Sequence, residues 1–137
     1  MRVGTPPILG LAALDAALDA WEDVDMQDVR RQSIRLCDLF VTEVERRCPV
    51  LELASPRDGQ KRGSQISFLH PEGYAIMQAL ISRGVIGDFR APNAIRFGFT
   101  PLYLGFEDVW RAADALQQVL EMGEWRRPEF NRKHAVT

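Results

Sequence analysis

The sequence predicts an α+β domain in which helices pack on one face of a mostly antiparallel sheet of three or four strands. Apolar residues recur every three or four positions in four segments, and short alternating segments lie between the second and the last of these helices. With 46% hydrophobic and 26% charged residues in 137, the composition is that of one ordinary globular domain. The elements are taken below in chain order.

The first two predicted helices occupy residues 7–21 and the segment from Asp25 to Pro49. Thr5 can cap the first helix, and prolines suit its first turn. Asp25 is placed to cap the second, which Pro49 ends. The first helix is strongly apolar and has little chain before it, so we expect its packing partners to lie outside this sequence.

Short strands and one helix follow. Residues 51–54 form a short apolar run, a loop occupies 55–63, and 64–69 alternate with Ile66 and Phe68 on one face. A third helix begins near Pro71 and ends at Gly84, a position typical of a helix C-cap. Residues 85–89 are predicted as the next strand.

The clearest period-two pattern follows a turn at residues 91–93. Ile95, Phe97 and Phe99 face one side, and Arg96, Gly98 and Thr100 face the other. A final helix ending at Gly123 carries an apolar face, and residues 124–137 form a polar, charged tail. The apolar face comprises Val109, Ala113, Leu116 and Leu120.

Charge and cysteine content limit the function classes. A net charge of −2 gives no electrostatic basis for binding nucleic acid. No apolar stretch reaches the roughly 18–20 residues that a membrane span needs, and we expect a cytoplasmic protein with no membrane partner. Cys37 and Cys48 share one predicted helix about 16 Å apart, so they are expected to be free buried thiols, and no metal site is predicted.

Few side chains suit chemistry, and Arg96 is the best candidate. His70 lies at a predicted turn, Lys61 in a solvated loop and Lys133 in the charged tail, so none has an environment that would activate it. Arg96 projects from a strand whose other face is apolar, between the small residues Ala94 and Gly98. A guanidinium there can bind a carboxylate through two parallel hydrogen bonds, although a salt bridge on a solvated sheet is the simpler alternative.

Several segments resemble kynureninases, in the order found in that family. They are residues 2–9 (RVGTPPIL), 62–68 (RGSQISF), 70–75 (HPEGYA), 84–90 (GVIGDFR) and 95–103 (IRFGFTPLY). The resemblance continues through residues 125–137, so it covers nearly the whole chain. Members of the family are about three times this length.

The resemblance implies the small C-terminal domain of a homodimeric, pyridoxal-phosphate-dependent enzyme of the aminotransferase-like fold class. Such enzymes hydrolyse L-kynurenine, or 3-hydroxykynurenine, to anthranilate, or 3-hydroxyanthranilate, and L-alanine in tryptophan breakdown. By resemblance, Arg96 binds the substrate carboxylate and Thr5 contacts the cofactor phosphate. Residues 1–24 would then join a missing N-terminal large domain to a small domain at 25–137. The large domain carries the Schiff-base lysine, so this chain alone is expected to hold no catalytic residue and to be inactive.

Two alternatives remain open from the residues alone. One is the small domain of another class V aminotransferase-like enzyme, such as a cysteine desulfurase, which also presents a carboxylate-binding arginine. The other is a non-catalytic α+β module that binds a small carboxylate through Arg96.

Overall fold

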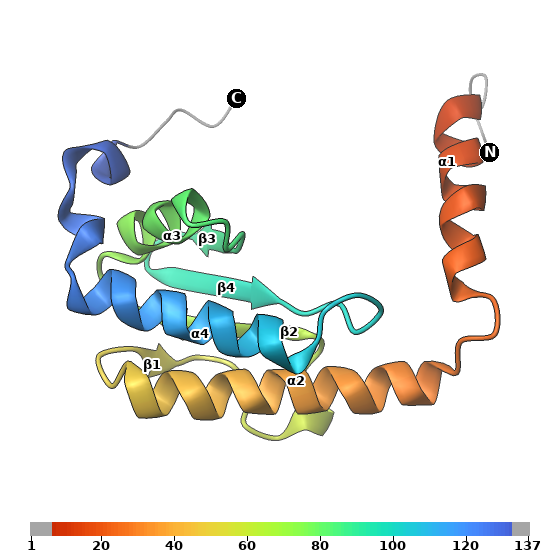
Figure 1. The fold of residues 1–137 in the computed structure, drawn as a ribbon, viewed down its shortest axis with the longest axis horizontal. Coiled ribbons are helices and arrows are strands. Elements are labelled where there is room, and N and C mark those ends of the chain that lie inside the picture. The colour runs from red at the N-terminus through yellow and green to blue at the C-terminus, as the bar shows by residue number, and fades with distance from the viewer. Residues whose placement is uncertain (1–6, 133–137) are drawn as a thin grey trace.

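A computed structural model describes residues 7–132, and its elements follow the predicted order (Figure 1). The helices are α1 Ile8–Leu18, α2 Met26–Arg47, α3 Gly73–Ser82 and α4 Phe106–Glu121. The strands are β1 Glu52–Leu53, β2 Gln65–Leu69, β3 Asp88–Arg90 and β4 Ala94–Gly98. Short 3-10 turns are η1 Asp19–Trp21, η2 Gly59–Lys61, η3 Glu124–Arg126 and η4 Pro128–Asn131.

The four strands form one sheet in the order β1-β2-β4-β3, and each neighbouring pair is antiparallel. The fold is therefore α+β with an antiparallel sheet, as predicted. Strand β4 lies between β2 and β3, so its backbone is held from both sides. This register places Arg96 opposite Ser67 on β2 and opposite Asp88 on β3.

Apolar side chains from one face of the sheet form the core with the helices. Ile66, Phe68, Ile95 and Phe97 are at most 4% exposed, and buried residues of α2, α3 and α4 join the same cluster. The Phe40 ring of α2 lies 4.8 Å from the ring of Phe97, centroid to centroid. The helices thus cover one face, as predicted, and within residues 7–132 the opposite face carries the polar positions of β2, β3 and β4.

Helix α2 begins and ends as its sequence predicts. The Asp25 side chain accepts a hydrogen bond of 2.7 Å from the Gln27 N–H, which satisfies one of the free donors of the first turn. The helix ends at Arg47, two residues before Pro49. Helix α3 ends at Ser82 with Arg83 as its C-cap, and Gly84 comes directly after it with a φ of +83°, a conformation that side chains with a Cβ rarely adopt. The prediction that α3 stops at Gly84 is thus confirmed to within two residues.

The strand predicted at residues 85–89 is shorter and starts later, at Asp88. Residues 85–87 instead lead from the end of α3 to the sheet, and Val85 packs against the core. Gly87 lies so close to β4 that a Cβ there would be 2.7 Å from the backbone oxygen of Arg96. The apolar character of 85–89 therefore reflects packing of the lead-in segment as well as strand formation.

The segment after Gly123, for which composition predicted a polar tail, folds back as η3 and η4 against α3. Trp125 and Phe130 are partly buried against the core. The Tyr74 hydroxyl of α3 donates a hydrogen bond of 3.0 Å to the Arg132 carbonyl. The tail thus belongs to the domain up to at least residue 132.

Helix α1 stands apart from the rest of the domain (Figure 1). It has no buried residue, and its substantial contacts within residues 7–132 are with the adjoining η1. Ile8, Leu14 and Leu18 are all more than half exposed. No helix within the described residues is both long enough and apolar enough to cross a membrane.

Candidate functional site

Arg96 lies near the middle of β4 on the face of the sheet that the helices leave uncovered. Its neighbours along the strand, Ile95 and Phe97, point into the core and are almost fully buried, which fixes the backbone on either side of it. The Arg96 side chain is 27% exposed. The predicted arrangement, an arginine held by a rigid strand, is therefore present in the structure.

The guanidinium of Arg96 is paired with the carboxylate directly across the sheet. Nη2 of Arg96 donates a hydrogen bond to Oδ2 of Asp88. Arg90 also lies beside this carboxylate, with its Nε 3.4 Å from the same oxygen. The hydrogen bond from Arg96 lowers the pKa of the Asp88 carboxyl below its ordinary value, so this carboxylate is ionised at neutral pH. Within residues 7–132, the buried Nε of Arg96 has no hydrogen-bond partner.

The space beside Arg96 is open. Gly98 is the next residue on the same face of β4, and a Cβ built there would meet no atom within 4 Å. The salt bridge that was the simpler alternative for Arg96 is present, with Asp88 as partner. One hydrogen bond to Asp88 uses only one of the five N–H donors of a guanidinium, which leaves donors for a second carboxylate.

The other described candidates from the sequence, Lys61 and His70, lie in environments that give them no chemical role. Lys61 is 76% exposed and lies 3.9 Å from Asp58, as expected for a solvated lysine. His70 accepts a hydrogen bond of 3.0 Å at Nδ1 from the Glu72 N–H, so it shapes the turn before α3. Partial burial lowers the pKa of His70. Thr5 and Lys133 lie outside the described residues.

Two arginines that the sequence analysis passed over are buried for structural reasons. The Arg62 side chain is 3% exposed and pairs with Asp38 of α2, while its Nη1 donates to the Pro56 carbonyl at 2.8 Å. The Arg47 side chain is 9% exposed, pairs with Asp114 of α4 at 3.0 Å and lies over the Trp110 ring. Both join segments distant in the sequence. For Arg47 the sequence signal was a basic residue beside apolar positions of α2, whereas Arg62 lies after η2 and had no such signal.

The cysteines are free and buried, as predicted. Burial raises the pKa of the Cys48 thiol to about 11, and burial likewise raises that of Cys37. Neither is therefore a nucleophilic thiolate at neutral pH. No group of histidine, cysteine or acidic residues in the described part of the chain could hold a metal ion.

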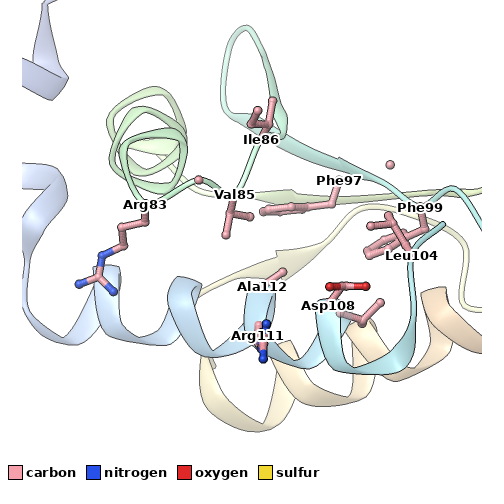
Figure 2. Close-up of a pocket in the computed structure, with 12 residues that line it drawn as sticks. Arg83, Val85, Ile86, Phe97, Phe99, Leu104, Asp108, Arg111 and Ala112 are labelled. Carbon is pink, nitrogen blue, oxygen red and sulfur yellow. The ribbon is translucent and has the colours of Figure 1, made fainter.

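A hollow of about 370 Å³ lies between β4, α4 and the segment after α3. Figure 2 shows Val85, Phe97 and Phe99 above α4, with Ile86 farther from the helix. Asp108 is the acidic residue that lines this hollow, and its carboxylate accepts a hydrogen bond of 2.8 Å from the Gly105 N–H at the start of α4. This apolar hollow lies on the helix-covered side of the sheet, whereas Arg96 projects from the opposite face.

Fold and site together define a domain in which Arg96 and Arg90, from adjacent strands, flank the Asp88 carboxylate on a sheet face left free by the helices. Residues 29–116 match the family described as the kynureninase C-terminal domain. This match covers more than half of the chain, and the chain therefore belongs to the kynureninase C-terminal domain family.

Relatives agree with this assignment. The chain is 50% identical over 136 residues to a kynureninase of Pseudomonas fluorescens. It is 51% identical over the same length to kynureninases of Burkholderia mallei strain ATCC 23344 and Burkholderia pseudomallei strain K96243. In each case the match covers 98% of this chain and 33% of the relative, so the chain spans about a third of the length of these relatives.

Proposed function

We propose that this chain is the substrate-carboxylate-binding part of a kynureninase that hydrolyses L-kynurenine, or 3-hydroxykynurenine, to L-alanine and the corresponding anthranilate. The observation that carries the proposal is Arg96, which is held on an interior strand and faces open space beside Gly98. Membership of the family supports the reaction and argues against a cysteine desulfurase. Thr5 is proposed to contact the cofactor phosphate.

In this proposal Arg96 binds the α-carboxylate through parallel N–H···O bonds, which orients the amino-acid end of the substrate. A guanidinium stays charged at every working pH, so binding does not depend on a proton at this group. The backbone that carries Arg96 is held in place because β4 is paired with a strand on each side. Correct placement of the reacting bond then follows from one fixed anchor.

Pyridoxal phosphate, the cofactor of the family, supplies an electron sink for bond cleavage. Residues 7–132 do not supply its lysine anchor, because Lys61, their one lysine, is exposed at the end of η2, with its Nζ 3.9 Å from Asp58 Oδ2. We therefore propose that the lysine that anchors the cofactor lies in another part of a longer protein and that the 137-residue chain alone is inactive. The exposed apolar side chains of α1 support a packing role for residues 1–24 against such a large domain.

We also propose that the longer protein is a cytoplasmic homodimer. The two buried free thiols suit a reducing compartment, in which disulfides are rare. The exposed apolar helix α1 is available for contacts that a single copy of this chain does not make.

The test is release of fluorescent anthranilate from L-kynurenine by the complete protein supplied with pyridoxal phosphate. We expect Arg96→Ala to lower kcat/KM by about two to three orders of magnitude, because truncating a charged pair leaves the substrate carboxylate without its partner. Arg111→Ala is the matched control, since Arg111 is an exposed arginine of α4 that pairs only with Glu107 in the described residues. No turnover by the complete wild-type protein would contradict the proposed reaction.

A non-catalytic carboxylate-binding module makes a different prediction. It would bind L-kynurenine or L-alanine as the 137-residue chain alone, with loss of binding in Arg96→Ala. Titration of the isolated chain by calorimetry separates the two functions, because the enzyme proposal requires the rest of the protein.

A further inference from the structure

The partner of Arg96 is a cross-strand neighbour, fixed by the sheet. Asp88 of β3 lies directly opposite Arg96 of β4 in the antiparallel register, and both side chains are on the uncovered face. Directly opposed residues in such a pair have Cβ atoms only about 5 Å apart. The hydrogen bond from Nη2 of Arg96 to Oδ2 of Asp88 is therefore a product of strand pairing rather than of a chance surface encounter.

Asp88 is itself held in place from both sides along the chain. Gly87 before it packs so tightly that any Cβ would meet the Met77 side chain at 2.6 Å. Phe89 after it lies edge-on to the Tyr74 ring at 5.6 Å. The backbone at Asp88 thus has a well-defined position, from which its half-exposed carboxylate reaches the Arg96 guanidinium.

Within the described residues, the hydrogen bond to Asp88 is the one that the Arg96 guanidinium makes, so this contact sets the orientation of its end. Its Nε has no partner within the described residues, and the space beside Gly98 is open. A long, flexible arginine side chain loses rotamer entropy when it binds a ligand. A residue that holds the guanidinium beforehand reduces that loss on binding.

We propose that Asp88 is a positioning residue for substrate-carboxylate recognition: it holds Nη2 of Arg96 so that the remaining donors of the guanidinium meet the carboxylate. The inference rests on the proposed function, in which Arg96 binds that carboxylate. A competing role, in which Asp88 occupies the place of the substrate carboxylate, predicts the opposite effect of removing its charge.

The experiment measures steady-state kinetics of the complete protein with Asp88→Asn. We expect KM for L-kynurenine to rise about tenfold, with kcat changed by less than about threefold, because a charged hydrogen bond that fixes the arginine is weakened. Glu52→Gln is the matched control. Glu52 is an exposed carboxylate of β1 on the same face of the sheet, two strands from Arg96, and its loss should leave KM unchanged.

A second readout separates positioning from a merely structural effect. The substrate is compared with its analogue in which the α-carboxylate is a carboxamide, and the ratio of the two kcat/KM values is measured. Asp88→Asn should reduce this ratio about tenfold, since the analogue never made the charged contact with Arg96. A structural defect would lower both values and leave the ratio as in the wild type.

The outcomes are distinct. If Asp88→Asn folds poorly, Asp88→Glu is measured in its place, because it keeps the charge. Its ratio of kcat/KM for the substrate to kcat/KM for the carboxamide analogue should lie between the ratios of the wild type and of Arg96→Ala. A fall in KM, or an unchanged ratio in a folded variant, would overturn the positioning role. If Arg96→Ala is defective while Asp88→Asn behaves as the wild type, only this inference fails. If the wild-type protein shows no turnover, the proposed function fails first.

Discussion

Consecutive helices α1 and α2 use apolar residues in opposite ways. Apart from Gly10 and Asp15, α1 is entirely apolar, yet it buries none of its residues. Helix α2 is rich in charged residues, yet it supplies much of the core. Its buried positions recur every three or four residues and are Ser33, Leu36, Cys37, Phe40, Val41 and Val44. Spacing, rather than total apolar content, therefore decides which helix stabilises this domain.

The largest effect should come from the centre of α2. Phe40 is fully buried and contacts the rings of Phe68, Phe97 and Phe99. Phe40→Ala should lower the free energy of unfolding by about 3–5 kcal/mol, because it removes apolar contacts and leaves a cavity. Urea denaturation of the 137-residue chain measures this, and a loss below about 1 kcal/mol would contradict the role given to α2.

The C-terminal end of α2 predicts a dependence on alkaline pH. The folded state raises the pKa of Cys48 to about 11 from an ordinary value of 9.0, so the unfolded chain loses this proton first as pH rises. Stability from this group is complete below pH 9 and should fall by about 1–3 kcal/mol toward pH 11. Denaturation at several pH values measures the slope. Cys48→Ala should reduce it, and the part that remains includes the buried Cys37, whose pKa is also raised.

A smaller effect is expected at the start of α2. Asp25→Ala removes the acceptor for the Gln27 N–H and should cost about 1 kcal/mol of unfolding free energy. Asp25→Asn is the control, because asparagine caps a helix about as well. Equal stability of Asp25→Ala and the wild type in urea would show that this cap contributes nothing.

The smallest effect on stability should come from α1. Leu14 is 55% exposed, so Leu14→Gln should change the unfolding free energy by less than about 0.5 kcal/mol. It should also reduce self-association of the chain in sedimentation experiments, since exposed apolar surface favours association. A stability loss above about 1 kcal/mol would mean that α1 packs on the domain and would remove the contrast with α2.

Periodicity predicted most of the fold. The order of elements, the antiparallel sheet and the placement of helices on one face follow from alternation in β2 and β4 and from the spacing in α2 and α4. The folded segment after Gly123 was missed because short 3-10 turns show no repeating apolar pattern. Trp125 and Phe130 in that segment were its only signal.

The candidate site was half predicted. Alternation around Arg96 identified the residue and the face on which it lies, but its partner Asp88 was missed because the register between residues 85–89 and the next strand was not considered. Counting outward from the turn at 91–93 would have paired 90 with 94 and 88 with 96, as the structure does. Burial of Arg62 could not have been predicted, since it depends on carbonyls that only the folded loop brings together.

The two glycines that flank the site would behave as opposites in a saturation mutagenesis library. At position 87 even alanine would collide with the β4 backbone, so nearly every variant should be lost with the fold itself. At position 98 the fold should accept many side chains, since a Cβ there meets nothing within 4 Å. Larger residues at 98 would fill more of the space beside Arg96 and exclude the ligand more strongly, while the protein stays folded. Such variants would separate loss of recognition from loss of stability in a genetic screen.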